Sequence, residues 1–229
     1  MVAGFGSKMY KLIPRQMQVD YLGLFSKPAI QIYGTGNRLL EELLSAFASF
    51  NIGVEDIRNE AGSPNLLEQA VSVGFATGGL FRLKLDRVQV SILDTSALET
   101  TTPVFEMLAH IGSWLRSAVP HFAFKMHQFT FMLHAAISGS TSLEVLTNLP
   151  SPQLQGVGKS EGTGFIFHWS IPDANLKVQL ILDHSLKVDH GLFVQLLVRA
   201  ESDEIDYEDS VAARDKILEE ALSSLNLEI

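Results

Sequence analysis

Hydrophobic residues recur along the chain with two different periods, and these periods separate strands from helices. Strict alternation of apolar and other residues is typical of half-buried strands, whereas apolar positions three and four residues apart are typical of helices. Residues 192–200 show the first pattern, and Val211, Leu218 and Leu222 show the second. The periods predict strands at residues 27–34, 68–78, 80–85, 87–94, 127–138, 165–171, 176–183 and 192–200, and helices at residues 35–53, 101–120 and 210–228.

Turn and loop residues divide these elements. The alternating positions change parity across Asp86 and Arg87, which predicts a tight turn or a bulge between two strand segments. Pro103 and Pro120 stand at the first turn and just past the end of the second helix. Residues 148–164, rich in Pro, Gly and Ser, are predicted to form a loop.

The predicted elements form two similar halves. Each half contains a strand, a connection, three strands and a helix, preceded by an N-terminal arm at residues 1–17. The halves are residues 18–120 and 121–229, as two domains or as one compact domain. We therefore predict an α+β fold in which two similar halves of antiparallel sheet carry helices packed on one face, and the repeated order suggests internal duplication.

Three stretches carry a family resemblance: "KPAIQIYG" at the first predicted strand, "LDRVQVSIL" in the first half and "VAARDKILEEAL" in the last helix. In their order and spacing they resemble a sporadically distributed bacterial family of unknown activity that is linked to the SecB-like fold. This resemblance implies a fold rather than a reaction. Because SecB-like proteins bind extended polypeptide on apolar grooves, it also implies peptide binding.

Composition narrows the class of protein. The chain of 229 residues is 46% hydrophobic and 19% charged, as expected for a globular protein with a core. It has no cysteine, which excludes disulfides and thiolate metal sites. The net charge is −9, most of it in the second half, and the chain has no basic patch, so a nucleic-acid partner is not expected. No apolar run suits a signal peptide or a membrane span, so we expect a cytoplasmic protein without membrane contact.

Residues 153–162, "QLQGVGKSEG", end like a phosphate-binding P-loop, with Gly158, Lys159 and Ser160 in the required order. The motif also needs a glycine five positions before Gly158, where this chain has Gln153. It needs a helix to follow as well, whereas the next residues alternate as in a strand. We therefore predict a loop here and no nucleotide cofactor.

Two Asp-His pairs in "LDHSLKVDHG" are candidate ligand or partner residues: Asp183 with His184, and Asp189 with His190. If the flanking strands form a hairpin, their apolar faces match when Leu182 lies opposite Leu192, which places His184 opposite His190. Two histidines do not complete a metal site, and the two aspartates then point to the other face. We expect a polar sheet rim without a metal ion.

The other histidines have no common partner in the sequence. His168 lies on the strand face opposite its aromatic neighbours and is a further candidate ligand or partner residue. His121 and His127 are about 20 Å apart along one predicted strand, too far for one metal ion. His110 is expected to pair with Glu106 on the exposed side of its helix.

The run "ESDEIDYED" at residues 201–209 holds six carboxylates and no glycine, unlike a calcium loop. We expect a solvated loop that favours the N-terminus of the last helix rather than a docking site for a basic partner.

These patterns favour a non-enzymatic binding or scaffold protein without catalytic residues, metal ion or cofactor. Its expected partner is an extended peptide or another protein, held at a sheet edge or in an apolar groove. Homodimerisation is compatible with this function. The alternative is a small-molecule-binding protein or an enzyme, with a pocket between sheet and helices and His184, His190 or His168 at its mouth.

Overall fold

The computed structural model describes residues 8–35, 37–60, 69–75, 78–93, 101–149 and 164–229. The P-loop-like stretch at residues 153–162 lies outside this part of the chain. In chain order the elements are β1 (Tyr10–Phe25), the 3-10 helix η1 (Ile30–Thr35), α1 (Asn37–Ala46), η2 (Ala48–Phe50), η3 (Val54–Asp56), β2 (Ile57–Glu60), β3 (Ala70–Phe75), β4 (Gly79–Lys84), β5 (Arg87–Leu93), α2 (Thr102–Ala118), β6 (Phe124–Ile137), α3 (Ser142–Asn148), β7 (Phe165–Ile171), η6 (Pro172–Ala174), β8 (Leu176–His184), β9 (Leu192–Ala200), α4 (Tyr207–Ser224) and β10 (Leu227–Glu228).

Within the described residues, ten strands form one sheet in the order β2-β3-β4-β5-β1-β6-β9-β8-β7, with β10 added beside the start of β1. Every neighbouring pair along the main path is antiparallel, and only β10 runs parallel to its partner. The two longest strands, β1 and β6, pair in the middle, from Leu12 opposite Ile137 to Phe25 opposite Phe124. From this pair each half extends outward first to its last strand, β5 or β9, and then back through the preceding strands, which are β4, β3 and β2 in the first half and β8 and β7 in the second.

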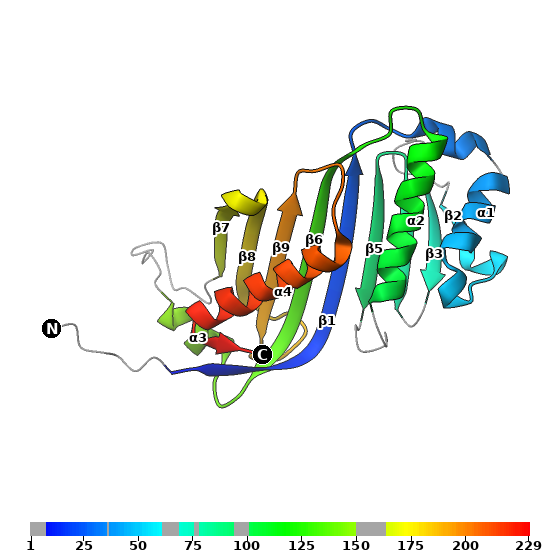
Figure 1. The fold of residues 1–229 in the computed structure, drawn as a ribbon. Helices are drawn as coiled ribbons and strands as arrows, with labels where there is room; N and C mark the ends of the chain where they lie inside the picture. The colour runs from blue at the N-terminus through cyan, green and yellow to red at the C-terminus, as the bar shows by residue number, and fades with distance from the viewer. Residues whose placement is uncertain (1–7, 36, 61–68, 76–77, 94–100, 150–163) are drawn as a thin grey trace.

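The helices α1, α2 and α4 lie on one face of the sheet (Figure 1). α2 runs along the strands of the first half, and α4 crosses those of the second half diagonally. The prediction of an α+β fold with an antiparallel sheet and helices on one face is therefore confirmed. Among the residues that the structure describes, no helix has both the length and the apolar character to cross a membrane.

Two hydrophobic clusters fill the space between the sheet and its helices. One lies under α1 and α2 and contains the fully buried Phe47 and Phe81. The other lies under α3 and α4 and contains the fully buried Leu133 and Leu180. Val19 of β1 packs against both clusters. The alternation predicted for the strands thus places one apolar row per strand in a continuous layer under the helices.

The turn expected near Asp86 is present, because β4 and β5 form a tight antiparallel hairpin across Leu85 and Asp86. The strand predicted at residues 27–34 is wrong: Ile30–Thr35 form η1. Ala29 and Ile32 in this stretch are fully buried, and the Ala29 amide donates to the Leu85 carbonyl. The apolar residues that suggested a strand therefore anchor a short helix to the end of the sheet.

The first strand of the sheet, β1, formed where no strand was predicted, and it begins at Tyr10, within the segment assigned to an arm. Its middle residues are polar or charged on one face, and it contains Pro14, which cannot donate to a ladder. The register shifts between Pro14 and Gln16, so a bulge accommodates the proline within a central strand. Two shorter elements, β2 and α3, also formed where no strand or helix was predicted.

The aromatic packing under α1 generates a test of the fold. Phe47 is fully buried, and its ring lies 5.3 Å from that of Phe75 and 5.2 Å from that of Phe81. Phe47→Ala should lower the free energy of unfolding in denaturant titrations by about 3–5 kcal/mol, because it leaves a cavity. The control, Val54→Ala, alters a side chain that is 56% exposed and should change it by less than about 0.5 kcal/mol. Equal effects of the two changes would contradict this account of the core.

Candidate functional site

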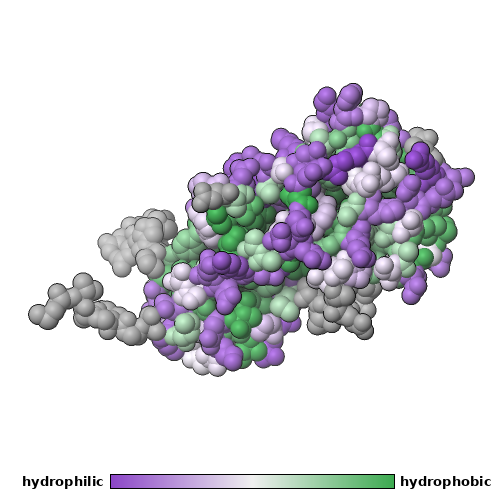
Figure 2. Space-filling model, in the orientation of Figure 1, coloured by the Kyte–Doolittle hydropathy of each residue, from purple (hydrophilic) through white to green (hydrophobic). Residues whose placement is uncertain are grey.

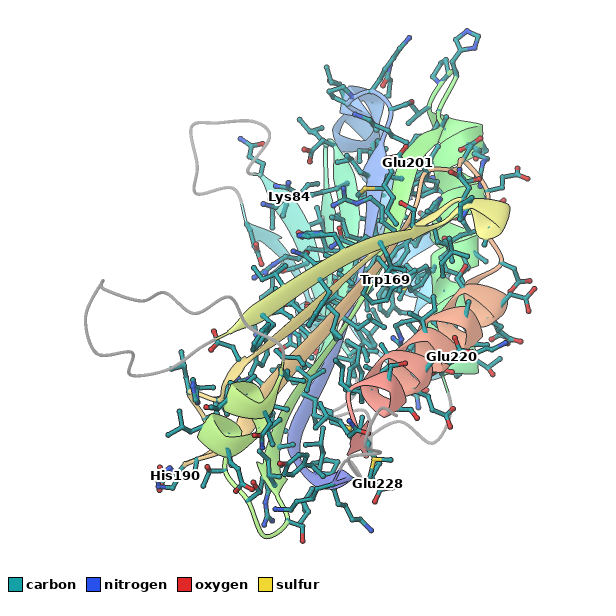
Figure 3. All side chains as sticks on the ribbon, turned by 90° about the vertical axis from the view of Figure 1, so that its left-hand side faces the viewer. Lys84, Trp169, His190, Glu201, Glu220 and Glu228 are labelled. Atoms are coloured by element: carbon teal, nitrogen blue, oxygen red, sulfur yellow. The ribbon has the colours of Figure 1, made fainter. Side chains whose placement is uncertain are left out.

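The hairpin of β8 and β9 places the predicted Asp-His residues apart. The parity of the register is as predicted, but the pairing is shifted by two residues, with Leu182 opposite Val194 and His184 opposite Leu192. The predicted juxtaposition of His184 and His190 is therefore wrong. His190 lies in the turn with a φ of 53° and is exposed, at the end of the molecule far from Trp169 in Figure 3. Parity alone does not determine which residues of equal parity meet.

The remaining candidates find separate partners. His184 Nδ1 lies 2.7 Å from the Ser142 hydroxyl at the start of α3. The Asp183 carboxylate accepts a hydrogen bond from the His184 amide, and Asp189 is exposed with its carboxylate 3.7 Å from His190. His168 is exposed on the sheet face opposite the helices. Among the described residues, no three His, Asp or Glu side chains are arranged to hold a metal ion.

The expected ion pair of His110 with Glu106 is not formed. Instead, His110 Nε2 lies 3.1 Å from the Glu42 carboxylate and links α2 to α1. His134, His184 and His190 lie near the β8–β9 turn, where Ser185 contacts His134 and Ser142 contacts the other two. The other four histidines lie elsewhere, so the seven do not build a common site.

A groove lies beside β7 on the helix-bearing face. Its floor is formed by Phe167, Trp169 and Ile171 of β7, and its wall by α4. Figure 3 is viewed toward the β7 edge. It shows Trp169 of β7 on one side of the groove and Glu220 of α4 on the other. The groove has a volume of about 340 Å³. Its remaining lining residues are Leu180, Ile217, Ala221, Ser224 and Leu225.

The strand that forms this groove is an edge strand with an exposed apolar side. Among the described strands β7 pairs only with β8, so its outer backbone edge has no ladder partner there. Phe165, Phe167, Trp169 and Ile171 alternate onto the helix-bearing face but remain only partly buried. In the first half, α1 and Phe47 cover the equivalent end of the sheet. In the second half the corresponding helix is α3, which has seven residues and packs at the end of β8 instead.

A second hollow, of about 450 Å³, continues the groove along α4 toward the N-terminus of that helix. Ile171 lines the first hollow and its strand partner Leu176 lines the second. Their linings contain no Lys or Arg, but they contain five carboxylates. These are Glu201, Glu204, Asp206, Asp209 and Glu220, of which Glu201 is paired with Lys177 at 2.6 Å. Figure 2 shows this face with green, hydrophobic surface between purple, hydrophilic patches.

The acidic run before α4 has two structural roles. As expected, it serves the helix N-terminus, because the Asp206 side chain accepts a hydrogen bond from the Asp209 amide. Asp203 has a different role. Its carboxylate accepts from the Phe124 amide at 2.7 Å, and its carbonyl accepts from Arg116 Nη2 at 2.9 Å. Asp203 thereby fastens the β9–α4 connection to β6 and α2.

A buried polar cluster lies at the centre of the molecule, between α2 and α4. The Nδ1 atom of His127 is 2.7 Å from the Tyr21 hydroxyl, and its Nε2 atom is 3.4 Å from the Asp203 carbonyl. A carbonyl can only accept, so Nε2 carries the proton and the Tyr21 hydroxyl donates to Nδ1. The Tyr207 hydroxyl lies 3.4 Å from that of Tyr21. Gly23, opposite His127, leaves room here, since a Cβ would lie 2.7 Å from the Tyr21 hydroxyl.

Burial sets the ionisation of this cluster. His127 is 1% exposed, and burial lowers its pKa to about 4. Burial also raises the pKa of Tyr21 well above its ordinary value, and that of Tyr207 in the same direction. All three side chains are therefore neutral at neutral pH. The parity that His127 shares with Phe129 and Phe131 indicates from the sequence that it belongs to the core face, but its partners cannot be predicted from that parity.

The central cleft is bounded by the same elements. It has a volume of about 340 Å³ and lies between α2 and α4 over β1, β5 and β6. Its walls are largely apolar, and its charged lining residues are Asp20, Arg214 and Asp215. Arg214 was not singled out from the sequence, because a single arginine in an amphipathic helix is normally exposed.

Comparison with known proteins gives no family assignment: no protein-family model matches the chain, and no curated protein matches it either.

The shifted pKa of His127 predicts an acid sensitivity of the fold. The unfolded chain binds a proton at His127 near pH 6.5, whereas the folded chain does so only near pH 4, so stability falls as the pH is lowered through this window. The loss attributable to His127 should be about 2 kcal/mol by about pH 5 and roughly 3 kcal/mol by about pH 4. Denaturant unfolding measured at several pH values gives this slope.

The variant His127→Gln has no titrating group at this position and should show a correspondingly shallower decline in stability between about pH 7 and pH 5. The control His121→Gln alters an exposed histidine and should retain the slope of the unaltered protein. If His127→Gln and the unaltered protein decline in parallel, the buried neutral state assigned to His127 is wrong.

Proposed function

We propose that this protein is a non-enzymatic binding or scaffold protein that holds an extended polypeptide along the outer edge of β7. The observation that carries the proposal is the combination of an uncharged edge strand with a partly exposed aromatic row beside an apolar groove. An added strand would gain main-chain hydrogen bonds from the edge, and its alternate side chains would enter the groove.

The contrast between the two ends of the sheet supports this function. Natural proteins protect sheet edges with short strands and charged residues, since an open edge invites pairing. β2 follows that rule, with only four residues, which include Arg58 and Glu60. β7 does not follow it: "FIFHWSI" has seven residues, no Lys, Arg, Asp or Glu and no proline. An edge of this kind is expected where pairing serves a function.

The charge of the groove defines the chemistry of the partner. The carboxylates along α4 and the absence of Lys and Arg from the groove lining favour a segment that combines alternating apolar residues with a basic residue. The acidic hollow lies beyond the C-terminal end of β7, so an antiparallel partner would place its N-terminal residues near it. Polypeptide binding also agrees with the resemblance to SecB-like proteins. A net charge of −9 agrees with the expectation of no nucleic-acid partner, and we retain the expectation of a cytoplasmic location.

The proposal predicts that the peptide Lys-Val-Thr-Val-Thr-Val-Thr-Val binds to the full chain, as measured by isothermal titration calorimetry. Trp169→Ala should weaken binding about tenfold to a hundredfold, because an aromatic anchor in an interface commonly contributes 2 kcal/mol or more. The matched control is Ile166→Ala, on the same strand but on the opposite face, with a side chain that is 60% exposed. It should change the affinity by less than about twofold.

Two altered peptides test the mode of binding. A proline in place of the central threonine removes a main-chain donor and should abolish strand addition. A glutamate in place of the lysine should weaken binding at low salt. If Trp169→Ala and Ile166→Ala bind the peptide equally well, the groove is not the site. If the chain instead forms a dimer that Trp169→Ala dissociates in sedimentation experiments, the edge serves a second copy, and the proposed peptide function is overturned.

A further inference from the structure

The geometry points to a second binding site, in the central cleft between α2 and α4, for a small apolar molecule that carries a carboxylate. The cleft is separate from the β7 groove, and α4 stands between them. With about 340 Å³ it lies at the lower end of the range for ligand pockets, which suits a medium-length acyl chain.

The body of such a ligand would contact an apolar lining drawn mainly from three elements, β5, β6 and α2. Val90 and Ile92 of β5 and Phe129 of β6 contribute to the floor, and Val104 and Leu108 of α2 contribute to the wall. All five residues belong to one hydrophobic cluster between the sheet and α2, so the cavity is framed by elements that already pack against each other. A cavity of this kind requires little rearrangement to accept an apolar chain.

Arg214 is the residue from which we infer that the ligand carries a carboxylate. This residue of α4 lines the cleft and is only 7% exposed. Its guanidinium lies 6.0 Å from the centre of the Phe131 ring. Both Nε and Nη2 donate to the same atom, Oδ1 of Asp215, at 2.9 and 2.6 Å. Nη1 has no hydrogen-bond partner in the described part of the chain and is not one of its buried unpaired atoms, so this donor is open to solvent and free to bind a ligand.

The two carboxylates of the lining, Asp20 and Asp215, act less strongly on a ligand in the cleft than the Arg214 guanidinium does. The Asp215 side chain is 57% exposed, so solvent screens it strongly, whereas the Arg214 side chain is 9% exposed. The Asp20 carboxylate already accepts hydrogen bonds from the Gln18 amide at 3.0 and 3.1 Å. The most deeply buried charge of the cleft is therefore positive, and a carboxylate matches its unused donors better than an alcohol or an amine does.

The experiment measures binding of decanoate, decanol and decylamine to the full chain by calorimetry, below the concentrations at which these compounds aggregate. We expect decanoate to bind about tenfold tighter than decanol, because a charge-assisted hydrogen bond adds to the same apolar contact, and decylamine to bind weakest. This comparison needs no variant. Equal affinities for decanoate and decanol, or tighter binding of decylamine, would overturn the proposal.

Variants then locate the site. Arg214→Met should remove the preference for decanoate over decanol while apolar binding persists, and Leu108→Trp, which fills the cleft, should weaken all three ligands about tenfold or more. Trp169→Ala should leave decanoate binding unchanged, which separates this site from the β7 groove. Decanoate binding that responds to Trp169→Ala but not to Arg214→Met would place the ligand in the groove and refute the assignment to the cleft.

Discussion

The antiparallel pairing of β1 with β6 is the constraint on which the rest of the molecule depends. These are the two longest strands, and each begins one half of the sheet. Because opposite residues of a ladder point to the same face, the pairing of Tyr21 with Phe129 and of Gly23 with His127 brings both apolar rows under the helices. The helices of the two halves therefore face each other across the seam, which is the line where β1 and β6 pair. The polar cluster and the central cleft lie at this seam, where α2 and α4 do not close completely over the sheet.

Apart from the additional edge strand β2, the two halves have the same strand order, but they differ in how each covers its outer end. In the first half, α1 places Leu43 against the sheet, and Phe47 follows it into the core. In the second half, the short α3 buries Val145 and Leu146 near the end of β8 and leaves the aromatic row of β7 partly exposed. An apolar row that is half exposed weakens the stabilisation of its own half of the sheet, since less surface is removed from water. Such a cost is expected where the surface serves recognition.

The sequence predicted β4, β5, β7, β8 and β9 well because apolar and polar or exposed positions alternate along each of them. It predicted β1 poorly, because this central strand has polar residues on its uncovered face and Pro14 at a bulge, and both features are typical of edges or loops. The residues of the candidate sites were harder still. The alternation of apolar residues in β7 predicted the row that contains Trp169. It did not predict that this row is exposed, because its exposure depends on where α3 ends and packs. The partners of His127 and the burial of Arg214 depend on contacts between segments far apart in the chain. The hydrophobic period of a single sequence contains no information about such contacts.

α4 forms a wall of both proposed sites, and its sequence reflects this. Val211, Arg214 and Asp215 face the cleft, whereas Ile217, Glu220 and Ala221 face the groove. The helix is held at both ends by central strands: Asp203 bonds to the first residue of β6, and β10, just after the helix, pairs with the start of β1. A wall anchored in this way is preformed, so a ligand loses little free energy in ordering it. The same anchoring limits how far occupation of one site can displace the helix toward the other. The two proposed sites therefore share a wall, and we expect them to bind their ligands independently.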